Sequence, residues 1–361
     1  MIDLFPFVKP FVHTLDAERA HTLTIAALKM GLDGKIGQMK DPENLRTTVF
    51  GLSLDNPVGL AAGFDKNADV IAPCQAMGFG FTEAGTVTPQ PQAGNEKPRL
   101  FRLKEDKAVI NRFGFNNKGL EYFAHSLGKL SPGSSKPFGA NVGANKATDD
   151  KTDDYVKGIR ALYGLADYFT VNISSPNTPG LRALQSRSAL TDLIKRVLEA
   201  REAEMASGKA YMPILIKIAP DLTSDDITDI AEIALTTDID GLIVSNTTIM
   251  RPADLKSQHR LEMGGLSGAP LMEPSTKILG EIYTATEGKV PLIGVGGIAS
   301  GADAYAKIRA GASLVQFYSA LVYEGPGLVD RIKKELSQRL KQDGYASVAE
   351  AVGADRKLRQ A

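Results

Sequence analysis

Eight short apolar runs, separated by longer segments with helical periodicity, constrain the fold of this 361-residue chain more than any other feature. A parallel strand that is covered on both faces is apolar along its length, and a helix usually connects it to the next strand. The intervening segments 186–204 and 300–310 have such helical patterns. The predicted strands span 58–62, 80–86, 138–142, 168–173, 214–218, 241–245, 292–295 and 314–318.

Eight strand–helix units between residues 58 and 318 predict an α/β fold, a (β/α)8 barrel of the TIM type. A doubly wound open sheet is the alternative architecture. It would require a Gly-x-Gly-x-x-Gly motif after the first strand in order to bind a dinucleotide, and this chain lacks one there. The barrel is therefore favoured.

Residues 1–40 have a different character from the barrel. An apolar start is interrupted by Pro6 and Pro10, and a helical pattern then begins with Asp16 as a capping residue and ends near Gly31. Two interpretations remain open: a helical cap folded onto the barrel, and an amphipathic helical pair that dips into a bilayer surface. The predicted division is an N-terminal helical extension, 1–40, and a barrel domain, 41–361.

Charge and composition exclude several functional classes. The 42 basic residues balance the 42 acidic ones, so the sequence gives no electrostatic reason to expect nucleic acid as a partner. One cysteine, Cys74, and four scattered histidines provide no metal-ligand spacing, and we expect no metal site. The sequence shows neither an apolar run long enough to span a bilayer nor a secretory signal, so we expect a reducing, intracellular environment.

Polar residues recur where the apolar strands end, which is the edge of a barrel that carries active sites. Three long connections, 87–137, 174–213 and 246–291, leave from the same edge. Buried polar groups need partners, and a single bound ligand could satisfy many of them. The strand-end positions are 62–66, Thr86, Asn141, Asn172, Lys217, Ser245, Asn246, 296–297 and 316–319.

Two glycine-dense loops indicate a phosphate-bearing cofactor. They span 264–268 and 294–298, and residues 318–320 close the last strand nearby. In barrels, bare backbone N–H groups after strands 7 and 8 commonly bind phosphate. Lys217 lies inside an apolar strand and needs an anionic or electron-rich neighbour. Either a structural ion pair or a reduced flavin ring could supply it, and we favour the flavin.

The segment after the fourth strand, residues 172–180, reads Asn-Ile-Ser-Ser-Pro-Asn-Thr-Pro-Gly. Together with the segments 63–66 and 111–116 and the glycine loops, it closely resembles the dihydroorotate dehydrogenases of class 2, which are membrane-associated and quinone-linked. The resemblance covers nearly the whole chain. It implies an FMN enzyme that oxidises dihydroorotate to orotate in pyrimidine synthesis, with a respiratory quinone as the electron acceptor.

The resemblance also implies the role of each site residue. Ser175 is the expected catalytic base, and Thr178 and the Phe115 ring shape the path by which its proton leaves. His21 and Arg102 are expected to line the inner end of a quinone tunnel. The expected substrate-binding residues are Lys66, Asn111, Arg112, Phe113, Gly114, Phe115, Asn172, Asn177, Asn246 and Thr247. The expected FMN-binding residues are Ala61, Ala62, Gly63, Lys66, Thr86, Asn141, Asn172, Lys217, Ser245, Gly268, Gly297, Tyr318 and Ser319.

Class 1 members of the family use a cysteine where this chain has Ser175, and Cys74 does not replace it. Cys74 has helical spacing after the first strand, where a buried inert thiol is expected. The resemblance further implies a monomer bound peripherally to the cytoplasmic face of the inner membrane. Without the resemblance, His21 would be expected on a helix surface, and the basic stretch from Arg331 to Lys341 on a solvated helix face.

Two alternatives to this function remain. One is an FMN barrel that acts on another pyrimidine, or that uses fumarate or NAD as its acceptor. The other is a catalytically silent barrel that serves as a membrane-bound binding module. The presence of Lys66, Ser175 and Lys217 together argues against the silent barrel.

Overall fold

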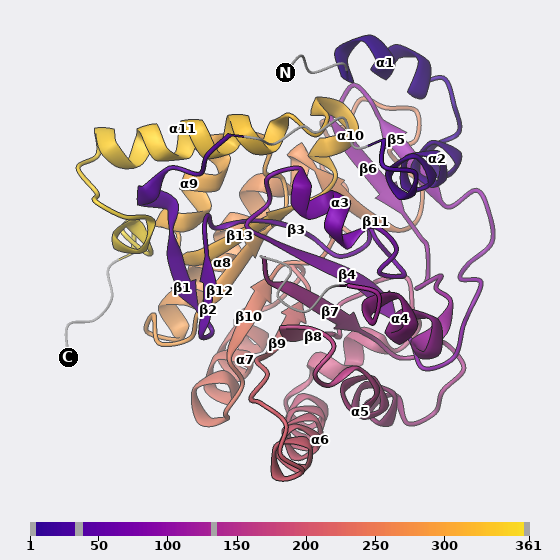
Figure 1. Cartoon of the computed structure of the whole chain (residues 1–361), viewed down its shortest axis with the longest axis vertical. Helices are drawn as coiled ribbons and strands as arrows, with labels where there is room; N and C mark the ends of the chain where they lie inside the picture. Colours follow the sequence, from indigo (N-terminus) through magenta and orange to yellow (C-terminus); the bar gives the residue numbers. More distant parts are fainter. Residues whose placement is uncertain (1–4, 33–38, 131–135, 357–361) are drawn as a thin grey trace.

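The computed structural model describes residues 5–32, 39–130 and 136–356, and it contains a closed parallel barrel of eight strands (Figure 1). Around the barrel the strands follow the order β10-β12-β13-β3-β4-β7-β8-β9. The (β/α)8 fold is therefore confirmed. The strands are β3 (Val58–Leu60), β4 (Phe81–Val87), β7 (Phe138–Val142), β8 (Tyr168–Asn172), β9 (Ile214–Ile218), β10 (Gly241–Val244), β12 (Leu292–Val295) and β13 (Ala312–Phe317).

All eight predicted strands form, because side chains on both of their faces are buried. Every residue of β7, β8 and β9 is buried, which explains their apolar sequences without alternation. The observed strand ends differ from the predicted ones by at most two residues. The register pairs Asn172 with Lys217 and Gly85 with Asn141, so the polar strand ends meet at one level of the barrel.

Helices cover the outside of the barrel, as the strand–helix alternation predicts (Figure 1). Cys74 is buried in the first of these helices, in agreement with the expected inert position. The helices are α3 (Ile71–Ala76), α4 (Gly119–Leu127), α5 (Lys151–Leu162), α6 (Arg187–Ala206), α7 (Ser224–Thr236), α8 (Met272–Ala285), α9 (Gly301–Arg309), α10 (Ala320–Glu324) and α11 (Leu328–Gln342).

The expectation of a solvated face for the basic C-terminal stretch is wrong at Lys333. This residue lies in α11 with its side chain only 1% exposed. Its ammonium forms ion pairs with Asp41 at 2.6 Å and Asp330 at 3.0 Å. These partners compensate the buried charge and attach the helix to the start of the barrel domain.

Two small antiparallel sheets lie outside the barrel. The hairpin β1 (Thr47–Val49) and β2 (Leu52–Leu54) packs with Phe81, Tyr168 and Leu215 of the barrel interior. It closes the end of the barrel where the strands begin. The second sheet joins β5 (Leu100–Leu103), β6 (Ala108–Asn111) and β11 (Gly265–Gly268), so two of the long connections contribute to one structure.

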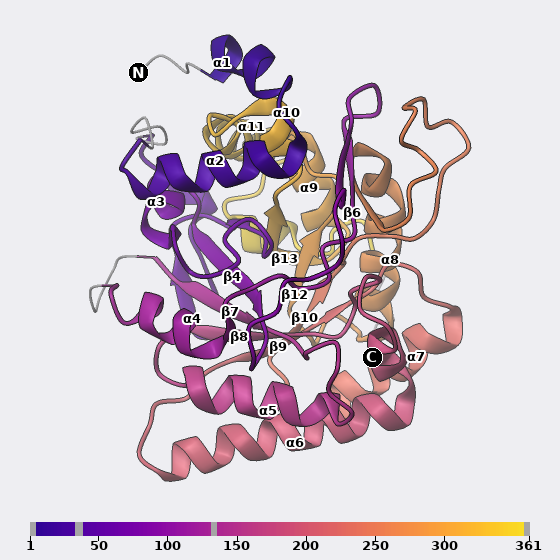
Figure 2. The same cartoon turned by 90° about the vertical axis from the view of Figure 1, so that its right-hand side faces the viewer.

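The N-terminal extension forms two helices, α1 (Phe5–Val12) and α2 (Ala17–Lys29), and Figure 2 shows α2 lying across the top of the barrel beside α3. Asp16 caps α2, since its carboxylate accepts a hydrogen bond of 2.9 Å from the Arg19 backbone. Pro10 lies inside α1, a helix that the sequence pattern does not predict. The predicted boundary between residues 40 and 41 stays a prediction, and residues 1–4 and 33–38 of the extension lie outside the described residues.

Within the described ranges, the helices are too short or too polar to cross a membrane.

Candidate active site

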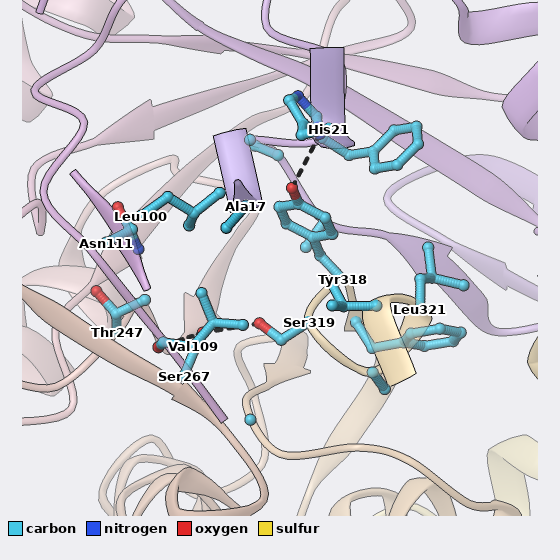
Figure 3. Close-up of a pocket in the computed structure, with 18 of the residues that line it drawn as sticks. Ala17, His21, Leu100, Val109, Asn111, Thr247, Ser267, Tyr318, Ser319 and Leu321 are labelled. Atoms are coloured by element: carbon cyan, nitrogen blue, oxygen red, sulfur yellow. Dashed lines mark hydrogen bonds between the residues drawn. The ribbon is translucent and has the colours of Figure 1, made fainter. Parts of the chain in front are cut away.

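One cavity of about 760 Å3 joins the N-terminal helices to the open mouth of the barrel. Side chains of α1 and α2 line its outer part, and Asn172, Ser175 and Lys217 line its inner part. Figure 3 shows His21 and Tyr318 on one side of this cavity and Asn111 and Thr247 on another. The cavity is therefore apolar toward the outer helices and polar at the strand ends.

Most of the predicted site residues line this cavity, although they come from distant parts of the chain. They are His21, Ala61, Ala62, Gly63, Lys66, Thr86, Arg102, Asn111, Phe113, Gly114, Phe115, Asn172, Ser175, Asn177, Lys217, Ser245, Asn246, Thr247, Gly268, Gly297, Tyr318 and Ser319. The roles assigned to them stay predictions, because a position in a cavity wall does not by itself establish a function.

Three predicted site residues are not part of the cavity wall. Arg112 forms an ion pair with Glu262 at 2.8 Å and stacks over the Phe101 ring, so its guanidinium is engaged elsewhere. Asn141 lies one layer deeper in the barrel, behind Thr86. Thr178 is buried, and its hydroxyl has no hydrogen-bond partner among the residues that the structure describes.

A chain of side-chain hydrogen bonds connects the polar strand ends. The Asn172 amide donates to the Thr86 hydroxyl at 2.9 Å, and that hydroxyl donates to the Asn141 carbonyl at 2.5 Å. The Asn246 amide in turn donates to the Asn172 carbonyl at 3.3 Å. Amides carry both donors and acceptors, so this wall can match a ring that bears lactam groups.

Ser175 lies in the loop after β8 and is 6% exposed. Its oxygen accepts a hydrogen bond of 3.3 Å from the Asn177 backbone, while the Asn177 side-chain amide donates to the Asn111 carbonyl at 3.1 Å. The Asn95 amide also donates to the Asn177 carbonyl, at 3.2 Å. These contacts hold the loop that carries Ser175 and Asn177 against the end of β6.

Lys66 and His21 meet where the polar and apolar parts of the cavity join. Lys66 Nζ lies 3.3 Å from His21 Nε2 and 4.4 Å from the centre of the Phe113 ring. Burial lowers the pKa of Lys66 to about 8. Burial, reinforced by the Lys66 charge, also lowers the pKa of His21 well below its ordinary value, so this imidazole is neutral at pH 7.

His21 does not lie on the free surface of its helix, as its helical position alone would suggest. Its ring packs edge-on against Phe64, and its Nδ1 lies 3.3 Å from the Tyr318 hydroxyl (Figure 3). Arg102 donates to the backbone carbonyls of Val12 and Leu15, so it also holds the turn between α1 and α2. Both residues line the cavity where the quinone tunnel is expected.

Lys217 is buried within β9, with 5% of its surface exposed, and it lines the cavity. Among the described residues, no hydrogen bond or ion pair within 4.0 Å satisfies its ammonium. Burial therefore lowers its pKa, although the charge of Glu83 opposes this effect. The alternative of a structural ion pair is not supported by these contacts, and an electron-rich ligand in the cavity would supply the missing partner.

The two glycine loops line the cavity, and at both of them the backbone of another segment packs directly against the glycine. Gly268 and Gly297 both have positive φ, and a Cβ there would lie 2.4 Å from the Lys107 carbonyl or the Met272 backbone respectively. The hydroxyls of Ser267 and Ser319 lie 2.7 Å apart beside them, and α8 begins at Met272. Backbone amides, hydroxyls and a helix start together fit a phosphate group.

Sequence reasoning missed two groups that support this site. Glu83 is a carboxylate inside an apolar predicted strand, the same signal that singled out Lys217. The Arg99 guanidinium pairs with Glu18 of α2 at 2.7 Å and also donates to the Asn95 carbonyl at 2.7 Å. No local sequence pattern predicts the ion pair between Arg99 and Glu18, because these two residues lie far apart in the sequence.

The family model for dihydroorotate dehydrogenase matches residues 44–340. The chain belongs to the dihydroorotate dehydrogenase family. It is 56% identical to a protein named dihydroorotate dehydrogenase (quinone) from Azorhizobium caulinodans, and the match covers 98% of this chain and 99% of that protein. A mitochondrial dihydroorotate dehydrogenase (quinone) of Oryza sativa is 49% identical to this chain, and the match covers 96% of this chain and 79% of that protein.

The resemblance to the quinone-linked class of dihydroorotate dehydrogenases is confirmed by these relatives. A solved structure supports the fold as well: the dihydroorotate dehydrogenase of Eimeria tenella in complex with ferulenol superposes with a TM-score of 0.91. That protein is 42% identical to this chain, and the match covers 95% of this chain and 96% of the other.

Proposed function

We propose that this protein oxidises dihydroorotate to orotate with FMN as its cofactor and a membrane quinone as its electron acceptor, in pyrimidine synthesis. The observation that carries the proposal is one cavity whose inner wall is polar and whose outer wall is apolar. Its inner part presents Ser175, Lys66 and several asparagine amides. Its outer part presents the apolar faces of α1 and α2, which suit a lipid-soluble acceptor.

The residues present fit an FMN group. Lys217 is a buried cation with no partner in the described residues, and Gly268, Gly297 and Ser319 surround a space suited to a phosphate. Ala61, Ala62, Gly63, Thr86, Asn172 and Ser245 would hold the ring and the chain between them. When bound, FMN supplies a hydride acceptor that can later release its electrons to a quinone.

Dihydroorotate must lose a proton from C5 and a hydride from C6 so that the double bond between these carbons forms. Ser175 is proposed to take the proton. A serine is a weak base, so its hydroxyl must pass its own proton onward as it accepts one. The buried Thr178 hydroxyl, which has no partner among the described residues, and the Phe115 ring in the cavity wall would shape that path.

The substrate would bind through charge at one end and through amides at its ring. Lys66 would pair with the carboxylate of dihydroorotate, because its buried ammonium forms no ion pair within the described residues and lies beside a neutral imidazole at 3.3 Å and the Phe113 ring at 4.4 Å. Asn111, Asn172, Asn177 and Asn246 would contact the lactam groups, and Thr247 would complete the site.

A comparison of electron acceptors tests this function. Purified protein should form orotate from dihydroorotate when a short-chain ubiquinone is present, and should form little or none with fumarate or NAD. The apolar outer cavity is the reason, since fumarate and NAD are strongly polar. Equal turnover with fumarate or NAD would support the alternative acceptor class instead.

We further propose that the protein acts as a monomer bound peripherally to the cytoplasmic face of the inner membrane. Several large apolar side chains of α1 and α2 face solvent, including Phe7 at 78% exposure and Phe11 at 68%, and Phe11 also lines the cavity. Exposed aromatic residues on short helices are typical of surfaces that enter the bilayer interface. Such binding would place the cavity opening next to dissolved quinone.

Replacing Phe7 and Phe11 together with serine should reduce binding to phospholipid vesicles at least about tenfold, because two aromatic rings no longer leave water. Cosedimentation measures the effect. The matched control replaces Leu261 and Met263 with serine. These residues are 78% and 79% exposed on a loop outside the N-terminal helices, and their replacement should leave vesicle binding unchanged. Equal losses in both variants would contradict the assignment of the membrane-binding face.

A further inference from the structure

Glu83 is a buried carboxylate in the interior of the barrel, 1% exposed, and it is not part of the cavity wall. Four donors surround its two oxygens. The Asn141 amide donates to one oxygen at 2.7 Å. Gln316, Thr170 and Tyr168 donate to the other oxygen at 3.0, 3.1 and 3.3 Å respectively. Three other barrel strands, β7, β8 and β13, therefore converge on this single group.

A carboxylate only accepts hydrogen bonds, so it dictates which end of a neighbouring amide faces it. Asn141 must turn its NH2 group toward Glu83, and its carbonyl then faces Thr86. That carbonyl accepts the Thr86 hydroxyl proton at 2.5 Å. The Thr86 oxygen is consequently left to accept the NH2 group of Asn172, at 2.9 Å.

The same direction continues to the far side of the barrel mouth. Asn172 turns its carbonyl away from Thr86, where it accepts from the Ser174 hydroxyl at 3.0 Å and the Asn246 amide at 3.3 Å. Each of these asparagines could otherwise rotate its amide by half a turn at little cost. A flip at one link would set two donors or two acceptors against each other at the next.

A buried charge is costly, and a well-packed apolar group of similar volume is often at least as stable. An apolar layer of the barrel interior, with Phe81, Leu215 and Ile293, packs without any buried charge, so packing alone does not require a carboxylate inside this barrel. Glu83 also forms no ion pair with Lys217 within 4.0 Å among the described residues. What the carboxylate uniquely supplies is an acceptor that cannot be reversed.

We propose that Glu83 is a positioning residue, which fixes the donor and acceptor orientation of the amides of Asn141, Asn172 and Asn246 at the cofactor and substrate sites. The inference rests on the proposed function, since it concerns how the same site recognises its pyrimidine. Glu83 acts through its neighbours and does not touch the substrate.

Binding of the product orotate to oxidised, FMN-loaded protein tests this role without turnover. Orotate is titrated while the change in the visible flavin spectrum is recorded. Glu83→Gln should weaken orotate binding on the order of 10- to 100-fold, because an amide at position 83 no longer imposes one direction on the chain. Thr170→Val is the matched control: it removes one donor from the same carboxylate and should change orotate affinity by less than about threefold.

A charge swap distinguishes orientation from simple loss of packing. In the double variant Glu83→Gln with Gln316→Glu, the new carboxylate accepts the NH2 group of the new amide, whose carbonyl then faces Asn141 again. The 3.0 Å contact between the two native side chains makes this exchange feasible. Orotate affinity should return to within about threefold of wild type, and flavin content should be retained.

Two results would overturn the role of Glu83: wild-type orotate affinity in Glu83→Gln, or a double variant that binds as weakly as the single one. Wild-type protein that carries FMN but does not bind orotate would instead overturn the proposed function. The failure of either idea can thus be told apart from the failure of the other.

Discussion

At the scale of single residues, Ser175 has the surroundings that a base without a neighbouring acidic or basic side chain would need. It is buried, and only the Asn177 backbone N–H contacts its oxygen in the described residues. Its own proton is therefore free to leave as the substrate proton arrives. The roles of Ser175 and Lys66 lead to separate predictions.

Ser175→Ala should slow the reduction of bound flavin by dihydroorotate by about 10²- to 10⁴-fold, the usual contribution of a general base. Stopped-flow absorbance under anaerobic conditions measures this rate. FMN content should be unchanged, because the residues proposed to hold the cofactor lie mainly on other strand ends. If the variant reduced its flavin at the wild-type rate, Ser175 would not be the base.

The lowered pKa of Lys66 predicts a pH dependence for binding of the orotate anion. Lys66 is charged below its pKa of about 8 and becomes neutral above it, while burial and the nearby Lys66 charge keep His21 neutral at pH 7. The dissociation constant of orotate should stay level below pH 7 and rise by about tenfold per pH unit above pH 8. It should level off once the pH passes the higher pKa of Lys66 in the complex. A constant affinity from pH 6 to 9.5 would contradict the pairing of Lys66 with the carboxylate.

At the scale of elements, α2 forms part of the wall of the outer cavity. Ala17 lines the cavity (Figure 3). Thr22, on the same helix, is exposed to solvent and is not part of the cavity wall. Ala17→Trp should reduce turnover with a short-chain ubiquinone about tenfold or more, because the indole fills the path between the apolar opening and His21. Reduction of the flavin by dihydroorotate should change by less than about threefold, since the substrate residues lie at the strand ends.

Thr22→Trp places the same bulk outside the cavity and should leave both half-reactions unchanged. Stopped-flow reduction and steady-state quinone turnover, measured on both variants, separate the two effects. Full quinone turnover in Ala17→Trp would mean that quinone reaches the cofactor by another route.

The elements that could be predicted from the sequence are those that carry their own periodicity. The eight barrel strands are apolar because both faces are covered, and α2 has a capping residue and helical spacing. The sheet β5-β6-β11 does not follow from the sequence pattern, because β11 joins the local β5-β6 hairpin across a long stretch of sequence. Helix α1 contains Pro10, yet it forms beside α10, where His13 reaches the Val322 carbonyl at 2.9 Å.

At the scale of the whole molecule, two chemistries share one cavity. Residues that the resemblance marked as substrate, cofactor or quinone contacts come together from all along the chain, with Arg112, Asn141 and Thr178 outside the cavity wall. These residues could be predicted to lie together because the parallel strands of a barrel all end at the same mouth, and the polar residues stand at those strand ends. Glu83 could not be assigned in this way, because its importance lies in the direction of hydrogen bonds that only the folded chain defines.

The most direct test of the central claim follows the two half-reactions in one sample without oxygen. Dihydroorotate should bleach the visible flavin band of the purified protein, and a ubiquinone analogue added next should restore the band. Fumarate or NAD added in its place should leave the protein reduced. A flavin that dihydroorotate fails to bleach, or that fumarate or NAD reoxidises as readily as quinone does, would contradict the proposed function.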